Sequence, residues 1–188
     1  MSNYVLVTGG AGYIGSHSVL ALMEAGYKPI VLDNFSNSSK ESISGIEKIN
    51  GGSPVVIEGN AGDSSLLRDI FSSYDINSVL HFSGLKSVEE SMDDPLKYYS
   101  ENVGSSLALF RAMQEANIQT IIFSSSATVY DPESQVPYAE NSPTNPINPY
   151  GRTKLCIEQI LHGLVSSNPK WRVGILRYFN PVGAHPSG

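Results

Sequence analysis

The chain has little cysteine, little basic charge and no long apolar run. Cys156 is the only cysteine among its 188 residues, so no disulfide can form within the chain. Its 12 lysines and arginines stand against 18 aspartates and glutamates, for a net charge of -6, and they form no basic stripe. That balance disfavours nucleic acid as a partner, and no apolar run approaches the ~18 residues that span a membrane. The composition favours small-molecule chemistry.

Targeting and metal-binding signals are equally scarce. Residues Met1–Asn3 lead directly into a strand-like run, without the basic and apolar regions of a secretory signal. The four histidines are scattered, with no spacing typical of metal ligands, so we expect no metal site. Together with the single cysteine, these features predict a reducing, cytoplasmic setting.

Short apolar runs rich in β-branched residues alternate along the chain with segments of helical character. The predicted strands are Tyr4–Val7, Pro29–Leu32, Val55–Ile57, Ser78–Phe82, Thr120–Phe123 and Arg172–Leu176. The predicted helices are Tyr13–Ala25, Lys40–Ile49, Ser64–Tyr74, Pro95–Asn117 and Pro149–Ser167. Because the strand runs are apolar on both faces, they suit a parallel sheet that helices cover on both sides. The sequence predicts an α/β fold, a doubly wound parallel sheet of the Rossmann type, in one dinucleotide-binding domain over residues 1–188.

Two of the predicted helices carry further detail. The last begins with Asn148 as its N-cap and Pro149 at the first helical position, after the proline-rich loop Asp131–Asn148. A loop of this length in a compact domain is more often functional than accidental. The side chains predicted to face inward from the first helix are Ile14, Ser18, Ala21, Leu22 and Ala25.

A glycine-rich loop follows the first predicted strand and opens the first helix. Its glycines Gly9, Gly12 and Gly15 have the spacing GxxGxxG. The first permits a tight turn, the second lets backbone amides approach a pyrophosphate, and the third allows the helix to contact the strand. The helix N-terminus also favours negative charge. The loop predicts a dinucleotide site, although this spacing alone occurs in many turns.

Asp33 ends the second predicted strand, 18 residues after Gly15. A carboxylate at this place can accept hydrogen bonds from a ribose diol, and it repels a 2′-phosphate. No arginine close in sequence offsets that repulsion. The sequence therefore predicts NAD rather than NADP as the cofactor.

Tyr150 and Lys154 lie one helical turn apart at the start of the last predicted helix, so their side chains share one face of it. An ammonium beside a phenol, together with the positive charge of an oxidised nicotinamide, favours the phenolate, a base able to take a hydroxyl proton. The hydroxyl-rich run that ends in Ser126 follows an apolar strand, at the sheet edge where α/β folds bind ligands. Tyr150, Lys154 and Ser126 are the predicted catalytic group.

These motifs belong to a larger set of segments. The set is VTGGAGYIGSH at 7–17, LDN at 32–34, HFSGLK at 81–86, SSSATVY at 124–130, NPYG at 148–151 and LRYFNPVGAH at 176–185. With these segments the chain resembles the extended short-chain dehydrogenase/reductase family and, within it, the UDP-glucose 4-epimerases. The resemblance covers essentially the whole chain.

The resemblance implies an NAD-dependent exchange of UDP-galactose and UDP-glucose through a 4-keto sugar. Tyr150 would be the base, Ser126 would assist proton transfer, and Lys154 would tune Tyr150 and hold the nicotinamide ribose. The implied cofactor residues are Gly9, Gly12, Tyr13, Ile14, Gly15, Asp33, Asn34, Phe35, Ser36, Asn37, Ser38, Asn60, Ala61, Phe82, Ser83, Gly84, Leu85, Lys86, Asn102, Ser124, Tyr150, Lys154 and Tyr178. The residues implied to contact the UDP-hexose are Lys86, Ser126, Ala127, Thr128, Tyr150, Tyr178, Phe179 and Asn180. The family also allows a homodimer of a full-length form.

Three positions depart from the family pattern. Asn60 stands where the family has an aspartate that bonds adenine, and Glu89 and Asp131 each replace a glycine. Because glycine reaches positive φ more easily than other residues, activity depends on the backbone at these two positions. The family's chains also continue into a region that supplies most uridine and diphosphate contacts. Residues 178–188 would begin that region, and we expect the rest of it to be absent.

Two alternatives stay open. A 4,6-dehydratase or related nucleotide-sugar oxidoreductase needs an acid–base pair beside the serine run, where Ser126-Ala127-Thr128 offers none. An inactive NAD-binding module would share the whole motif set. For the chain as given we expect NAD binding without turnover, with epimerase as the function of the family.

Overall fold

The computed structural model describes residues 3–187, so Met1, Ser2 and Gly188 of the predicted domain lie outside the described residues. The strands are β1 (Tyr4–Thr8), β2 (Lys28–Asp33), β3 (Val55–Glu58), β4 (Ile76–His81), β5 (Thr120–Ser126) and β6 (Arg172–Tyr178). They form one parallel sheet in the order β3-β2-β1-β4-β5-β6. This is the order of a doubly wound dinucleotide-binding fold, so the predicted fold is confirmed.

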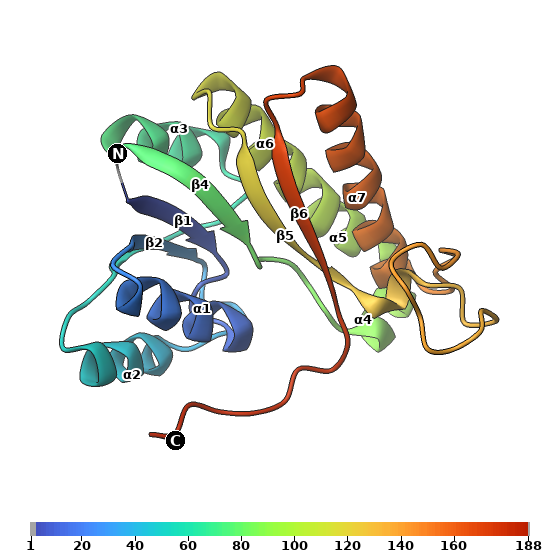
Figure 1. Cartoon of the computed structure of the whole chain (residues 1–188), viewed down its shortest axis with the longest axis horizontal. Coiled ribbons are helices and arrows are strands. Elements are labelled where there is room, and N and C mark those ends of the chain that lie inside the picture. The colour runs from blue at the N-terminus through green and yellow to red at the C-terminus, as the bar shows by residue number, and fades with distance from the viewer. Residues whose placement is uncertain (1–2, 188) are drawn as a thin grey trace.

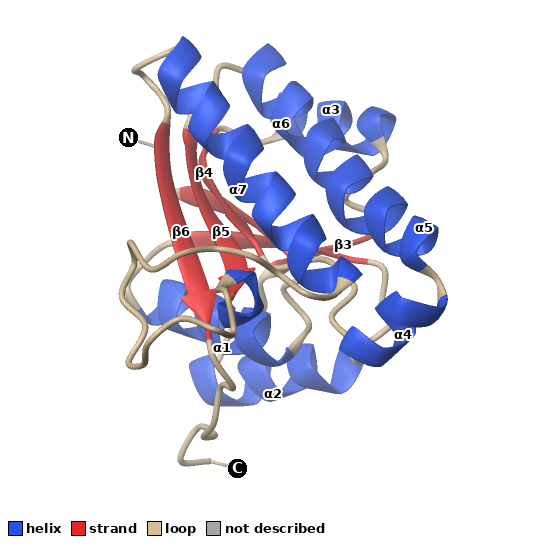
Figure 2. Ribbon diagram, turned by 90° about the vertical axis from the view of Figure 1, so that its right-hand side faces the viewer, coloured by secondary structure: helices blue, strands red, loops and turns tan. Residues whose placement is uncertain are grey.

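Helices cover both faces of the sheet (Figures 1 and 2). They are α1 (Tyr13–Glu24), α2 (Lys40–Asn50), α3 (Ser64–Ser73), α4 (Val88–Asp93), α5 (Pro95–Tyr98), the π-helix η1 (Tyr99–Gly104), α6 (Ser105–Glu115), the 3-10 helix η2 (Ala127–Val129) and α7 (Pro149–Ser167). In both views α1 and α2 lie on one side, and α3, α6 and α7 lie on the other. Between β1 and β4 the strand order reverses, which in such folds opens a crevice at the carboxyl ends of the strands.

Alternate side chains of β1 contribute to two apolar cores. Val5 and Val7 join the cluster with α1 and α2, whereas Leu6, between them, joins the larger cluster with α3, α6 and α7. Each of the three is at most 2% exposed. A central parallel strand requires burial on both faces, which explains the run of apolar residues from Val5 to Val7.

Helix α7 begins as the sequence predicts. Asn148 Oδ1 accepts a hydrogen bond from the Gly151 N–H at 2.8 Å, and Pro149 occupies the first turn, where a proline N has no helical partner to lose. The helix has the predicted bounds. The loop before it is irregular, with one bridge between Tyr130 and Thr144.

The helix predicted over Pro95–Asn117 is present, but it is not one regular α-helix. The segment divides into α5, η1 and α6, and α6 ends at Glu115. In η1 the helix widens to a π-turn, which side-chain hydrogen bonds of Asn102 and Ser106 stabilise. Apolar periodicity does not record such a widening.

Helix α4 is missing from the sequence prediction. Ser87 is its N-cap, and Ser87 Oγ accepts a hydrogen bond from the Glu90 N–H at 3.2 Å. Serine followed three residues later by glutamate is the pattern of a capping box. That pattern was the signal that would have found α4.

The inward face predicted for α1 is only partly met, since Leu22 packs against the core but other predicted residues do not. Gly15, Val19 and Leu20 are its buried residues, whereas Ala21 and Ala25 are exposed. The helix is turned so that Gly15 lies against the preceding loop, where no side chain would fit. The glycine contact, rather than the largest apolar side chains, therefore sets the face that packs on the sheet.

Candidate functional site

A cavity of about 1090 Å³ opens at the carboxyl ends of the strands. The predicted residues that line it are Gly9, Gly12, Tyr13, Ile14, Gly15, Asp33, Asn34, Ser36, Asn37, Ser38, Asn60, Ala61, Phe82, Ser83, Gly84, Leu85, Lys86, Ser124, Ser126, Ala127, Thr128, Tyr150, Lys154, Tyr178, Phe179 and Asn180. Of the predicted set, only Phe35 and Asn102 do not line it. The structure brings the glycine loop and the predicted catalytic group to one space.

The glycine loop forms a wall of bare backbone. Gly9 has φ +70°, and a Cβ there would lie 2.6 Å from the Ser83 nitrogen. A Cβ on Gly15 would overlap the Gly9 carbonyl oxygen and lie 2.8 Å from Gly10 Cα. Gly12, which has no side chain, is the N-cap of α1. The N–H groups at this helix start can therefore approach an anion directly.

Asp33 ends β2 and is 7% exposed. Its carboxylate accepts hydrogen bonds from the Ala11 N–H at 2.9 Å, the Phe35 N–H at 3.0 Å and the Ser38 hydroxyl at 2.8 Å. These bonds fix the carboxylate at the cavity wall beside the glycine loop. A carboxylate has about four lone-pair sites, so one remains for a ribose hydroxyl.

Phe35 and Asn102 lie behind the cavity wall. Phe35 has φ 54°, and its ring packs against the α1–α2 core with Lys40 Nζ 5.2 Å from its centroid. The Asn102 amide accepts a hydrogen bond from the Leu85 N–H at 2.7 Å and donates one to the Leu85 C=O at 3.1 Å. Both residues shape the wall from behind, and their direct contact with a cofactor stays a prediction.

Lys154 is 5% exposed, and its ammonium donates a hydrogen bond to the Ser124 C=O at 2.8 Å. Nζ also lies 4.9 Å from the centroid of the Phe123 ring and 5.9 Å from that of the Tyr150 ring. Burial lowers the pKa of Lys154 to about 8, because a buried ammonium loses hydration. Near neutral pH, Lys154 still carries its charge at the cavity wall.

The protonation of Tyr150 depends on burial and on neighbouring groups. Burial raises the pKa of Tyr150, and a hydrogen bond with Ser126 lowers it in part. In the free chain the Lys154 ammonium, which donates to the Ser124 carbonyl, does not offset this rise. That the ammonium and an oxidised nicotinamide together favour the phenolate stays a prediction. Without a further positive charge, Tyr150 is a phenol at neutral pH.

Ser126 ends β5, and Thr128 orients its hydroxyl. Ser126 Oγ accepts hydrogen bonds from the Thr128 N–H at 3.2 Å and from the Thr128 hydroxyl at 2.9 Å. A serine hydroxyl has two acceptor sites and one proton. With both acceptor sites occupied, Ser126 can only donate, toward Tyr150 and the cavity. A hydroxyl that donates to a phenol in this way can take part in proton transfer by that phenol.

A buried ion pair that the prediction lacks supports this side of the cavity. Glu158 is 1% exposed, and its Oε2 lies 2.7 Å from Arg177 Nη2. The Ser125 hydroxyl also donates to Glu158, and the Arg177 guanidinium lies 4.8 Å from the Tyr130 ring centroid. The pair joins α7 to β6. Glu158 stands one helical turn after Lys154, a spacing that was visible in the sequence.

Aromatic rings extend from this ion pair to the predicted hexose contacts. Tyr138, in the irregular loop, stacks on Tyr130 with ring centroids 4.8 Å apart and on Phe179 with centroids 6.4 Å apart. Phe179 is 63% exposed and lines the cavity with Asn180. The loop before α7 therefore supports the cavity wall after β6.

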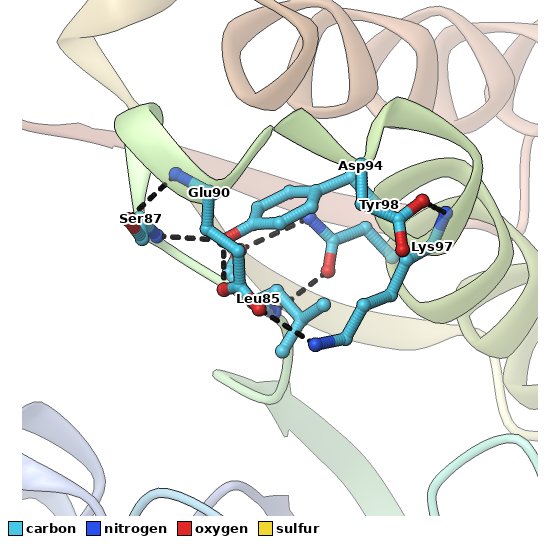
Figure 3. Close-up of polar contacts among 7 residues, drawn as sticks. Leu85, Ser87, Glu90, Asp94, Lys97 and Tyr98 are labelled. Carbon is cyan, nitrogen blue, oxygen red and sulfur yellow. Dashed lines mark hydrogen bonds and ion pairs between the residues drawn. The ribbon is translucent and has the colours of Figure 1, made fainter. Parts of the chain in front are cut away.

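Figure 3 shows a polar group at the cavity rim that the prediction also lacks. Glu90 Oε1 lies 2.6 Å from Lys97 Nζ, and the Tyr98 hydroxyl donates to Glu90 Oε2 at 2.9 Å. Tyr98 accepts a hydrogen bond from the Ser87 N–H at 3.0 Å, and burial raises the pKa of Tyr98 to about 12. The lining residues outside the prediction are Leu32, Gly59, Val88, Glu90, Lys97, Glu101, Ser105, Ser125 and Pro181.

The three departures from the family pattern fit the local structure. Among the described residues, two that are not glycine have positive φ, and neither is Glu89 or Asp131. Glu89 lies in the first turn of α4, where negative charge is stabilising. Asn60 lines the cavity, and its Oδ1 accepts a hydrogen bond from the Gly62 N–H at 2.7 Å. The backbone does not require glycine at Glu89 or Asp131.

Two further kinds of feature are absent from the part of the chain that the structure describes. Residues 3–187 contain no group of three His, Cys, Asp or Glu side chains able to hold a metal ion. Across that same range, no helix is both long and apolar enough to cross a bilayer.

The chain is similar to known proteins along nearly its whole length. The model of the NAD dependent epimerase/dehydratase family matches residues 5–188. A UDP-glucose 4-epimerase of Yersinia pestis is 52% identical over 186 residues, which are 98% of this chain and 55% of the relative. One of Dictyostelium discoideum is 50% identical over 184 residues, 98% of this chain and 54% of the relative. The chain spans about half the length of the curated relatives it matches.

Solved structures have the same fold. The UDP-glucose 4-epimerase of Stenotrophomonas maltophila, with bound NAD and formylated UDP-arabinopyranose, matches with a TM-score of 0.95 and 44% identity over 98% of this chain and 55% of that one. The Bifidobacterium longum enzyme, in complex with NAD+ and UDP, gives the same TM-score, identity and coverage. The similarity therefore includes the sheet and the residues around the cavity.

Proposed function

The chain belongs to the NAD dependent epimerase/dehydratase family, and we propose that it provides the NAD-binding and proton-transfer part of a UDP-glucose 4-epimerase. Such an enzyme interconverts UDP-galactose and UDP-glucose by inverting the hydroxyl at C4 of the hexose. Relatives with this name are about half identical to the chain, and solved relatives with this name hold NAD. NAD is the proposed cofactor, and a UDP-hexose is the proposed substrate.

The observation that carries the proposal is that the glycine wall and the catalytic group share one cavity. The bare backbone at Gly12, at the start of α1, suits a pyrophosphate, and Asp33 suits a ribose diol while repelling a 2′-phosphate. Tyr150 and Lys154 line the same cavity from α7, and the strand order reverses between β1 and β4. Dinucleotides bind across that crevice in doubly wound folds.

The residues of the chain transfer the proton of the reaction. NAD, when bound, supplies the acceptor and donor of the hydride. Tyr150 takes the proton of the C4 hydroxyl, leaving a 4-keto sugar, and returns it after the sugar has turned over. Ser126 donates its single proton to Tyr150 in the free chain and can donate it to the hexose oxygen instead when the sugar is bound, which would align that oxygen with the phenol. Lys154, bonded to the Ser124 C=O, has two further protons that suit a ribose hydroxyl.

Burial raises the pKa of Tyr150, so the phenol needs activation before it can act as a base. In the free chain the phenol keeps its proton at neutral pH, so the base must be activated. A cationic ring in the cavity favours the phenolate by Coulomb attraction. The proposal therefore links deprotonation of Tyr150 to the oxidised form of the cofactor.

Finer points stay predictions. They are the cytoplasmic setting, a homodimer of a full-length form, and contacts of Phe179 and Asn180 with the hexose. Phe179 and Asn180 both line the cavity, and the Phe179 ring is exposed there. Both side chains are therefore accessible to a sugar that turns over in the site.

NAD binding and turnover test the proposal. We expect the chain to bind NAD in isothermal titration calorimetry, and Tyr150→Phe to bind it with similar affinity because the phenol oxygen does not form the pyrophosphate site. In a protein of the family's length that carries these residues, we expect conversion of UDP-galactose to UDP-glucose without added NAD. There, Tyr150→Phe should abolish turnover.

Three outcomes would change the assignment. Unchanged turnover in Tyr150→Phe would remove the proposed base. A 4-keto-6-deoxy product would identify a dehydratase instead of an epimerase. NAD binding without turnover in the protein of full family length would identify an inactive binding module.

A further inference from the structure

His81, at the end of β4, does not line the cavity and is 1% exposed. Its ring packs against Phe123 and Phe110, with centroid distances of 5.7 and 6.3 Å. Both ring nitrogens have hydroxyl partners: Nδ1 lies 2.7 Å from Thr8 Oγ1, and Nε2 lies 2.9 Å from Ser106 Oγ. An imidazole bonded at both nitrogens is fixed from two sides.

The direction of these hydrogen bonds follows from their partners. The Ser106 hydroxyl donates its single proton to the Asn102 C=O at 2.6 Å, so it must accept from His81 Nε2. Nδ1 is then the acceptor of the Thr8 hydroxyl. Thr8 Oγ1 accepts in turn from the Ser83 hydroxyl at 3.1 Å, which is closer than the 3.4 Å between Ser83 Oγ and Nδ1. One continuous chain of bonds runs from Ser83 to the Asn102 carbonyl.

The charge state of His81 agrees with this direction. Burial and the nearby Lys154 ammonium lower the pKa of His81 to about 3. The ring is therefore neutral at physiological pH and has one donor and one acceptor.

Asn102, where this chain of bonds ends, belongs to η1 and contacts two parts of the site. Its side chain holds the N–H and the C=O of Leu85, in the loop that lines the cavity. The same amide donates to Thr153 Oγ1 at 3.1 Å, and the Thr153 hydroxyl donates to the Tyr150 C=O at 2.7 Å. The π-helix thus connects the loop at Leu85 with the turn that carries Tyr150.

We propose that His81 is a positioning residue: its bond to Ser106 anchors η1 to the centre of the sheet, and η1 in turn sets Leu85 and Tyr150 relative to each other. Thr8 and His81 end the neighbouring strands β1 and β4 and are register partners. An anchor on strands is more precise than one on loops, and π-turns inside helices occur frequently at functional sites. The inference rests on the proposed function only for the role of Tyr150.

The direction of the bonds is tested in the unaltered chain by nitrogen-15 NMR of labelled histidine, which distinguishes the two neutral tautomers. We expect the His81 proton on Nε2, and no titration of His81 between about pH 5 and 8. A proton on Nδ1, or titration near the ordinary pKa of about 6.5, would overturn the inference.

Positioning is tested by hydrogen exchange of the Leu85 amide. His81→Phe keeps an aromatic ring against Phe123 but removes both hydrogen bonds. We expect the Leu85 N–H to exchange about tenfold faster or more in this variant, with the core amide of Val31 unchanged. His162→Phe, at an exposed position of α7, is the matched control and should leave Leu85 unchanged.

Ser106→Ala removes the acceptor of His81 Nε2 and also the hydrogen bond to the Asn102 C=O, which is the next bond of the same chain. We expect it to raise Leu85 exchange at least as much as His81→Phe does, and the double variant to exchange no faster than Ser106→Ala alone, because the bonds lie in series. Additive effects in the double variant would overturn the inference, and so would unchanged Leu85 exchange in Ser106→Ala, which can be measured even if His81→Phe does not fold. These readouts need no cofactor, so failure of the chain to bind NAD would contradict only the proposed function.

Discussion

The two sides of the cavity are formed by different kinds of groups. On the side of β1, β2 and α1 the wall is glycine backbone, with the Asp33 carboxylate held by neighbouring donors. On the side of β5, β6 and α7 it rests on buried charged side chains, Lys154 and Glu158. The first side is therefore sensitive to added volume, and the second to a change of charge. That difference suits one side that holds a nucleotide and another that moves a proton.

The largest effect is expected from Glu158→Ala on the charged side. The substitution leaves the Arg177 guanidinium, whose side chain is 19% exposed, without its carboxylate. Breaking a buried pair from one side should lower the free energy of unfolding by about 3 kcal/mol, measured by urea denaturation. Glu115→Ala, at an exposed position of α6, is the control and should stay within about 0.5 kcal/mol. Equal losses in the two variants would contradict the role of the pair.

The next effect is expected from Gly15→Ala on the backbone side. The added Cβ would overlap the Gly9 carbonyl oxygen, so we expect a loss of about 2–3 kcal/mol in unfolding free energy and loss of NAD binding. Gly163→Ala, inside α7 with nothing within 4 Å of the added Cβ, should instead stabilise the chain by about 0.5–1 kcal/mol. If the first variant kept its stability and its affinity for NAD, volume would not be what limits this side.

A smaller effect is expected from pH on the charged side. Burial lowers the pKa of Lys154 from 10.5 to about 8 in the folded chain. Between these values the unfolded chain binds more protons, so stability rises as pH increases from 8 to 10. The gain should be about 2 kcal/mol relative to Lys154→Met, from denaturation of both proteins at each pH. Parallel pH dependence in the two proteins would show that Lys154 is not the buried group responsible.

The smallest effect is expected from a charge on the backbone side. Lys40 and Glu58 form an ion pair at 2.7 Å with side chains that are 70% and 62% exposed. Because water screens such pairs, Lys40→Ala should change the unfolding free energy by less than about 1 kcal/mol, with a smaller change at high salt. A loss as large as that of Glu158→Ala would remove the contrast between the two sides.

The sequence predicted most of the fold because its signals are local. Each strand contains a short apolar run, and Asn148 and Pro149 mark the start of α7 as the structure has it. The Ser87–Glu90 capping pattern is equally local and marks the start of α4, which apolar periodicity does not indicate. The π-turn at Asn102 has no local signal, because hydrogen bonds to residues distant in sequence stabilise it.

The site was predictable from the sequence at positions where the local backbone geometry requires one residue type. Gly9, Gly15 and Asp33 lie at the cavity wall, as the motif requires. The protonation of Tyr150 was not predictable from spacing, because it depends on where the Lys154 ammonium points and on how deeply the phenol is buried. The support of Glu158 likewise comes from β6, across the fold.

The most direct test of this account is the pKa of Tyr150 in the presence of the two forms of the cofactor. Ultraviolet titration of the chain, with Tyr150→Phe subtracted, isolates this phenol from the other tyrosines. The account predicts a lower pKa of Tyr150 with NAD+ bound than with NADH bound, because only the oxidised ring is cationic. The same pKa of Tyr150 with both forms would contradict it.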